Sequence, residues 1–376
     1  MFVAMGLGRF SYTAMVPALV ESGRLDAVSA GHVGTANLAG FLIGAMLSIP
    51  LARLMPRVRL LGVAVLVALA GLGASALSNA FAWLAGWRGL IGVATGIVMV
   101  HSLALITESA PADRRAEGAG YVFAGVGGGI LSSGILVPAL LGLGLDACWW
   151  GLGGIACLGA GIAWWGWAGV PGEPATDLSL PSGIMAPRGP LLALIAAHGL
   201  FSMGIVPHTL YWVDFLVRGL GLGTAFGGMQ WSLVGIFAVL GPFLTAQLAR
   251  RTGTSVALVV ALVVLGLGIA GPWLLPTVPV LFLSTAIFGA QPGISSLMAA
   301  RARDLGDPTQ MGRVMRLMIL SNSVGAVAGG VLVPWIYAAF GGHAAVFLTG
   351  GLAMLAGAAV VLPAAVAVGM ARQPAP

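Results

Sequence analysis

The sequence contains no lysine and few charged residues of either sign. Charged residues make up 7% of the 376 residues, whereas hydrophobic residues make up 59%. A water-soluble domain of this length could not cover its surface with so few charges. The mean hydropathy of +1.02 agrees with this reading. The composition therefore excludes a soluble protein and predicts a chain embedded in a membrane.

Motifs for catalysis, cofactors and metals are also missing. The sequence has no H-E-x-x-H zinc site, no G-x-S-x-G nucleophile elbow and no phosphate-binding P-loop. Its two cysteines, Cys148 and Cys157, lie nine residues apart on different turns of one apolar run, which predicts neither a disulfide nor a metal site. Gly266-x-Gly268-x-x-Gly271 matches a dinucleotide fingerprint, but no strand precedes it. We therefore expect no enzyme, no catalytic residue, no cofactor and no metal, and an energy source other than ATP.

Long apolar runs fill most of the sequence. A hydrocarbon core of about 30 Å requires about 20 apolar residues per helix. Closed β-barrels would need short alternating strands instead of continuous runs. We predict an all-α membrane protein with twelve transmembrane helices. The expected helices cover residues 1–20, 32–52, 60–79, 81–106, 118–142, 148–169, 191–217, 225–248, 255–275, 278–299, 314–338 and 344–367.

The chain repeats itself at a spacing close to half its length. Three patterns return 196 or 197 residues later: Leu51-Ala52-Arg53 as Leu248-Ala249-Arg250, Gly92-xxx-Gly96 as Gly289-xxx-Gly293, and Gly134-Ile135-Leu136-Val137-Pro138 as Gly330-Val331-Leu332-Val333-Pro334. We predict two six-helix bundles, residues 1–169 and 191–367. A cytoplasmic linker, 170–190, joins them, and a cytoplasmic tail, 368–376, follows. Two similar halves in one bilayer are typical of transporters that rock about a site between the halves.

The arginines predict the orientation. Arg24 and Arg218 fall on the outer side, while Arg9 and Arg88 fall within helices. The other thirteen lie on one side, which predicts a multi-pass protein of the inner or plasma membrane with both termini in the cytoplasm. Because these arginines are spread over short loops, the net charge of +6 reflects topology, and we expect no nucleic-acid partner. The thirteen are Arg53, Arg57, Arg59, Arg114, Arg115, Arg188, Arg250, Arg251, Arg301, Arg303, Arg313, Arg316 and Arg372.

Two loops carry decayed copies of a known signature. Leu248-Ala249-Arg250-Arg251-Thr252-Gly253, and more weakly the segment after Leu51, resemble the G-x-L-A-D-R-x-G-R-R loop of the major facilitator superfamily. Arg88-xxx-Gly92-xxx-Gly96 resembles that family's fourth-helix motif. Segments 8–13 and 124–127 are most similar to the YbfB/YjiJ-like branch, which implies a transporter but no particular substrate. In the family the loop acid helps to latch the two halves. Arginine stands at the acid position in both copies here, so the resemblance implies a different gating latch, formed by Arg53, Arg250 and Arg251.

Arg9 and Arg88 are the first candidates for substrate binding. Each lies roughly 10–13 Å into its helix, at 1.5 Å per residue. An arginine at this depth costs about 2.5–3.5 kcal/mol unless it meets a partner or a wet cavity. All eleven acids fall in loops or at helix ends, so an anionic substrate could bind the cations. The alternative is that Arg88 reaches Glu21, Asp214 or backbone carbonyls. The resemblance places helices 1, 4, 7 and 10 around the central cavity.

Further polar candidates lie on helices 1, 7 and 10. Ile205, His208 and Trp212 recur at helical spacing with Tyr211 beside them. His208 could carry a coupled proton, or it could simply follow a turn kinked at Pro207. Tyr12 beside Arg9 and Gln291 in helix 10 are further candidates for contacts with the substrate. At the outer end of helix 7, Asp214 and Arg218 are expected to form an exposed ion pair or a gating element.

Taken together, the residues and the resemblance predict a secondary active transporter of a small organic solute. The solute is anionic or zwitterionic, and the mechanism is rocker-switch alternating access. Drug or metabolite efflux is the alternative, and a non-transporting membrane sensor is a third hypothesis. The expected partners are a small-molecule substrate, the lipid bilayer and a coupling proton, and we expect a monomer.

Overall fold

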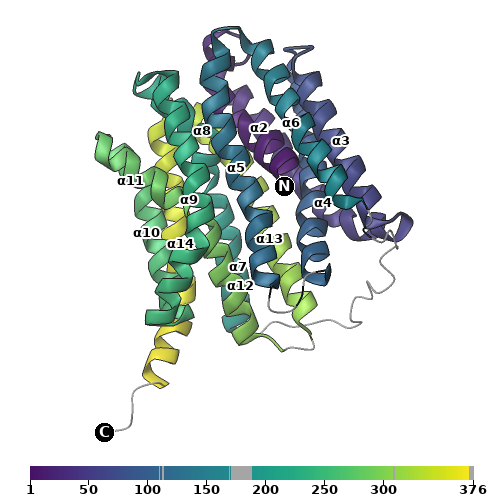
Figure 1. Cartoon of the computed structure of the whole chain (residues 1–376). Coiled ribbons are helices and arrows are strands. Elements are labelled where there is room, and N and C mark those ends of the chain that lie inside the picture. Colours follow the sequence, from purple (N-terminus) through teal and green to yellow (C-terminus); the bar gives the residue numbers. More distant parts are fainter. Residues whose placement is uncertain (110, 112–113, 169, 171–188, 308–309, 372–376) are drawn as a thin grey trace. The chain divides into compact units, whose positions relative to one another are not determined.

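A computed structural model of the protein describes residues 1–109, 111, 114–168, 170, 189–307 and 310–371. Within these residues every regular element is a helix (Figure 1). Most of the predicted linker and the last residues of the predicted tail lie outside the described residues. The helices are η1 (Phe2–Arg9), α1 (Phe10–Glu21), α2 (Ala27–Leu54), α3 (Arg57–Ser75), α4 (Phe81–Ser109), α5 (Arg115–Leu141), α6 (Leu145–Trp167), α7 (Gly189–Gly204), α8 (Val206–Asp214), η2 (Phe215–Gly219), α9 (Gly223–Thr252), α10 (Thr254–Leu274), α11 (Val278–Gly289), α12 (Pro292–Leu305), α13 (Met311–Phe340) and α14 (His343–Ala371).

Twelve helical segments of the described chain are long and apolar enough to cross a membrane, which confirms the twelve predicted helices. Two of them are interrupted. The seventh breaks after Gly204 and resumes as α8, and the tenth breaks after Gly289 and resumes as α12. Pro207 and Pro292 lie in the first turns that follow the breaks. A proline there removes no intrahelical hydrogen bond, whereas further inside it would.

The first spanning segment begins as a π-helix, η1, and continues as α1. π-Helices are rare and occur frequently at functional sites. Here a close contact accompanies the wide turns: a side chain at Gly6 would meet the backbone of Gly129 in α5. Small residues at such positions let helix backbones approach each other. Sequence periodicity did not predict this element.

The chain packs into two compact units: Met1–Leu178 with Thr209–Val239 and Gly330–Gly341, and Ser179–His208 with Leu240–Gly329 and Gly342–Pro376. In the first unit, glycines bring α2 and α4 together, because side chains at Gly40 and Gly92 would collide with the backbones of Gly89 and Asn37. The two six-helix bundles that the sequence repeat predicts, 1–169 and 191–367, remain a prediction.

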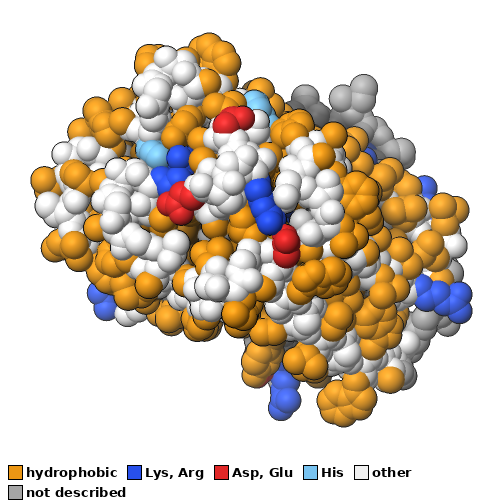
Figure 2. Space-filling view, turned by 90° about the horizontal axis from the view of Figure 1, so that it is seen from above, with side chains coloured by type: hydrophobic (Ala, Val, Ile, Leu, Met, Phe, Trp, Pro, Cys, Tyr) orange, Lys and Arg blue, Asp and Glu red, His pale blue; other side chains and the backbone are white. Residues whose placement is uncertain are grey.

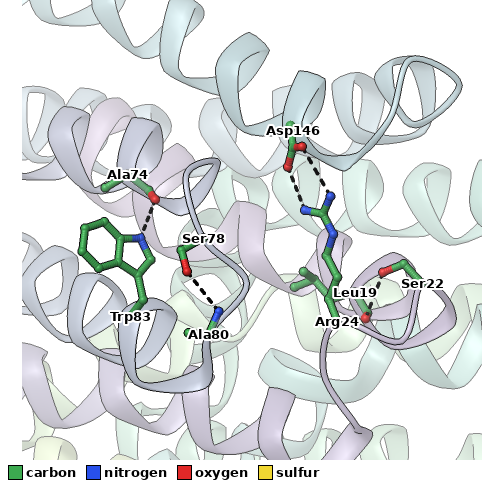
Figure 3. Close-up of polar contacts among 8 residues, drawn as sticks. All are labelled: Leu19, Ser22, Arg24, Ala74, Ser78, Ala80, Trp83 and Asp146. Atoms are coloured by element: carbon green, nitrogen blue, oxygen red, sulfur yellow. Dashed lines mark hydrogen bonds and ion pairs between the residues drawn. The ribbon is translucent and has the colours of Figure 1, made fainter.

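Polar contacts at one end of the first unit tie its loops to its helices (Figure 3). Arg24, in the turn after α1, donates two hydrogen bonds to Asp146 at the start of α6, at 2.7 and 3.4 Å. The Trp83 indole donates to the carbonyl of Ala74 at 2.7 Å and joins α4 to α3. Exposed ion pairs contribute only about 0.2–1 kcal/mol, so these contacts set loop positions more than overall stability.

The second unit repeats a glycine contact of the first. A side chain at Gly44 would collide with the backbone of Val93, and one at Gly241 with the backbone of Ala290. Gly44 and Gly241 are separated by 197 residues, and so are Val93 and Ala290. This is the spacing of the sequence repeat, so the repeat corresponds to the same helix pairing in each unit.

Large apolar side chains are exposed along most of the helices, including Phe243, Leu158 and Trp165. Figure 2 views the molecule from above, along the helices, and shows many hydrophobic and few charged side chains at that end. Single exposed apolar residues are ordinary on soluble proteins, but such extensive exposure is typical of surfaces that face lipid.

Candidate functional site

Arg88 is almost fully buried in α4, with 1% of its surface exposed. Its guanidinium donates to the carbonyl of Gly8 at 2.6 Å and to that of Arg9 at 2.7 Å. The ring of Tyr12 lies 4.8 Å from its Cζ. Of the alternatives for Arg88, the structure therefore shows backbone carbonyls. Arg88 holds α4 against the junction of η1 and α1.

Side-chain donors satisfy three consecutive carbonyls at this junction. Arg88 binds those of Gly8 and Arg9, and the Trp231 indole of α9 donates to that of Phe10 at 3.2 Å. In a membrane, an unsatisfied carbonyl costs several kcal/mol. The wide helical turns of η1 are therefore stabilised by side chains from α4 and α9. Sequence patterns gave no signal for Trp231, because an indole donor at a helix surface has no characteristic spacing.

Arg9 has a different environment. Its Cζ lies 5.2 Å from the centre of the Phe10 ring and 5.1 Å from that of Phe41 in α2. The side chain is only partly buried, and its Nε is buried without a hydrogen-bond partner. Among the described residues, no carboxylate or other acceptor binds the Arg9 guanidinium. Cation–π contacts of this kind contribute about 0.5–2 kcal/mol, less than an ion pair in a dry site would.

A small cavity of about 10 Å³ adjoins both arginines. Three buried polar atoms of its lining residues, Arg9 Nε, Arg88 Nε and Asn37 Oδ1, have no hydrogen-bond partner. A cavity of this size holds about one water molecule. The site thus offers donors and an acceptor to one small polar group. The lining residues are Arg9, Tyr12, Thr13, Gly34, Asn37, Leu38, Arg88, Thr209 and Leu210.

Tyr12 and Asn37 are fixed by backbone contacts. The Tyr12 hydroxyl donates to the carbonyl of Ala30 at 2.9 Å, and the Asn37 amide donates to the carbonyl of Arg88 at 2.9 Å. Tyr12 therefore presents its ring, and not its hydroxyl, to Arg88. Asn37 also lies in the cavity wall.

Four residues form what we call the Asp214 cluster. Tyr211, Asp214 and Arg218 lie near the end of the seventh spanning segment, and Tyr337 lies in α13. Arg218 donates to both carboxylate oxygens of Asp214, at 2.6 and 2.8 Å, and lies 3.5 Å from the Tyr337 hydroxyl. The rings of Tyr211 and Tyr337 stack at 5.1 Å. The expected ion pair is formed, but it is not an exposed pair. Asp214 is completely buried, because the chain continues as η2 beyond it.

Other candidates on helix 7 have partners of their own. The Tyr211 hydroxyl donates to the carbonyl of Ala27 at 2.8 Å, and Trp212 is buried with its ring 6.0 Å from that of Phe215. His208 Nε2 lies 2.8 Å from the Ser284 hydroxyl. Proton transfer through His208 remains a prediction.

Rings also surround His208 in the second unit. Phe288 and Phe347 lie 4.8 and 5.0 Å from its imidazole. Gln291 precedes the first turn of α12, at the break in the tenth spanning segment, and is partly exposed. The structure therefore brings Arg9, Tyr12 and Arg88 together, while His208 and Gln291 belong to the other unit.

The three arginines of the predicted latch are all exposed. Arg53 lies in the last turn of α2, and Arg250 and Arg251 lie in the last turn of α9. Their part in gating remains a prediction. No group of three or more histidine, cysteine, aspartate or glutamate side chains suited to a metal occurs in the part of the chain that was described.

Known proteins resemble the chain over nearly its whole length. A family model described as "Uncharacterised MFS-type transporter YbfB" matches residues 1–362. No curated protein sequence matches the chain.

Solved transporter structures share its fold. A D-xylose–proton symporter has a TM-score of 0.76 at 15% identity, covering 96% of this chain and 94% of its own. A POT family transporter in complex with 5-aminolevulinic acid scores 0.77 at 13% identity, covering 98% and 95%. A bacterial homologue of the lysosomal transporter Spinster scores 0.71 at 15% identity, covering 98% and 94%. At these identities the similarity concerns the fold alone.

Proposed function

Since this chain belongs to the MFS-type transporters of the YbfB family, we propose that it is a secondary transporter of a small organic anion or zwitterion. It moves the solute by alternating access of two halves. Both termini lie in the cytoplasm, because the arginine-rich loops then follow the positive-inside rule. The protein is a carrier and not an enzyme.

The observation that carries this proposal is the state of Arg9. Its guanidinium lies within a spanning segment, between two aromatic rings, without an acceptor among the described residues. A cation in this position gains most from an anion that arrives with the substrate. A carboxylate suits it because two parallel N–H···O bonds match the guanidinium geometry.

Arg88 acts as a positioning residue in this scheme. Two of its donor groups are already bound to the carbonyls of Gly8 and Arg9, so it holds the backbone from which the Arg9 side chain extends. Its charge also raises the positive potential of the cavity. Lipophilic cations, the substrates expected for a drug efflux pump, would meet two like charges in a low dielectric.

The test is a thermal-shift screen of purified protein in detergent. The probes are carboxylates, amino acids, sugars and lipophilic cations, applied to the parent, Arg9→Gln and Arg9→Lys. A ligand at about 100 times its dissociation constant adds about 2.7 kcal/mol of stability. We expect a carboxylate to stabilise the parent, Arg9→Lys to respond weakly and Arg9→Gln not at all.

Arg24→Gln is the matched control, because Arg24 lies in a loop and pairs with Asp146. It should respond to the carboxylate as the parent does. Equal stabilisation of the parent and Arg9→Gln would refute the anion site. Stabilisation by lipophilic cations alone would favour efflux. Radiolabelled uptake of the identified ligand into proteoliposomes then separates a transporter from a sensor, which would bind without moving it.

A further inference from the structure

A larger cavity lies in the second unit, at the arginine-rich ends of its helices. It measures about 330 Å³, within the range of small-molecule sites. Helices α9, α10 and α12 form its walls. The lining residues are Pro242, Thr245, Ala246, Ala249, Arg250, Thr254, Ser296, Leu297 and Ala300.

The polar part of this cavity is positively charged. Arg250 lines it and has no ion pair or hydrogen bond among the described residues, and no acid belongs to the lining. Helix α10 begins at Thr254, directly after Gly253 in the left-handed region, with φ 83°. No side chain caps this helix end. Its first N–H groups and the Arg250 guanidinium together offer donors and positive charge to an anion.

Two hydroxyl groups of the lining are already engaged. Thr245 donates to the carbonyl of Gly241 at 3.0 Å, and Ser296 donates to that of Pro292 at 3.2 Å. Their protons therefore point to their own helices. Arg250, the Thr254 hydroxyl and the first N–H groups of α10 are the donors that remain for a ligand, so this end of the cavity suits negatively charged oxygens.

The rest of the cavity is apolar and borders a lipid-facing surface. Pro242, Ala246 and Leu297 supply its carbon-rich wall. Phe243, which follows Pro242 on α9, and Val256, two residues after Thr254 on α10, are exposed. A soluble anion would leave this apolar surface unused, whereas a lipid places charge at one end and hydrocarbon at the other.

We propose that this cavity binds the phosphate group of an anionic phospholipid. The phosphate contacts the Arg250 guanidinium and the first turn of α10, and an acyl chain follows the exposed apolar side chains of α9 and α10. Basic pockets between transmembrane helices are known lipid-headgroup sites. This site is separate from Arg9 and does not depend on the proposed substrate.

Native mass spectrometry of the delipidated protein tests the proposal. The probes are dioleoyl phosphatidylglycerol, dioleoyl phosphatidylcholine and inorganic phosphate, titrated into the parent, Arg250→Gln, Ala246→Phe and Arg251→Gln. Arg251 is the matched control, because it is the adjacent exposed arginine but does not line the cavity. Ala246→Phe fills the cavity without changing any charge.

Phosphatidylglycerol should bind the parent more tightly than phosphatidylcholine does. Arg250→Gln should weaken it about tenfold, the effect of losing one charge-assisted contact. Ala246→Phe should also weaken it, because the larger ring occupies the space of the ligand. Arg251→Gln should stay close to the parent. Unchanged binding to Arg250→Gln, or an equal loss in Arg251→Gln, would overturn the proposal. So would equal affinity for phosphatidylcholine, or displacement of the lipid by inorganic phosphate at the same concentration, which would indicate a site for soluble anions.

Discussion

Replacing Arg218 by glutamine should destabilise the protein strongly, because Asp214 then loses its ionic partner. Asp214 is completely buried and receives two hydrogen bonds from Arg218, whose own side chain is 22% exposed. Removing one member of a buried pair costs about 3–5 kcal/mol. Because water reaches Arg218, we expect the lower end, about 3 kcal/mol. Arg218→Gln with Asp214→Asn removes both charges and should return to within about 1 kcal/mol of the parent.

The assay is thermal unfolding of the detergent-purified protein, followed by tryptophan fluorescence at one scan rate. At about 2 °C per kcal/mol for a large domain, Arg218→Gln should lower the melting temperature by about 6 °C. The double variant should recover most of this shift, and the difference gives the coupling energy of the pair. A single variant that melts like the parent would refute the reasoning. So would a double variant that loses the sum of the two single effects.

Two further predictions concern packing and capping. Gly40→Ala should cost about 1–3 kcal/mol, because its methyl group would collide with the carbonyl of Gly89; Gly86→Ala in α4, with open space around it, should be neutral or stabilising in the same melting assay. Asp26 caps α2, and hydrogen bonds from Ser29 hold the pKa of its carboxyl below its usual value of 3.8. Asp26→Ala should therefore cost about 1 kcal/mol and Asp26→Asn much less. The ionic part of this cap is present above the unfolded pKa and is lost as pH falls through the lower folded pKa, so melting temperatures of parent and Asp26→Asn should converge in acid.

The twelve spans could be predicted because hydropathy is a local property of the sequence. The breaks at Gly204 and Gly289 could not, since proline occurs inside other helices of this chain without interrupting them, as Pro138 and Pro334 show. The sequence also identified both intramembrane arginines, because each lies inside an apolar run. It could not assign their roles, because the partners of Arg88 are backbone carbonyls at a π-helical junction, and these leave no sequence pattern.

The sequence predicted an exposed Asp214, and this prediction was wrong for a related reason. A charged residue near the end of an apolar run suggests a helix terminus at the membrane surface. The chain instead continues for five residues as η2, and Tyr337 approaches from a segment more than a hundred residues away. Burial of this kind depends on tertiary contacts and not on neighbouring residues.

The wide turns of η1 have a consequence for motion. They are retained while donors from Arg88 and Trp231 occupy the carbonyls of Gly8, Arg9 and Phe10. If either donor withdrew, the segment would lose a contact that holds this junction, and tightening of η1 into an α-helix would use about one residue less per turn. That change moves the preceding residues by one position, a rotation of about 100° around the helix axis. One step of such a register change would turn Met5 and Phe2 to a different face of the first spanning segment.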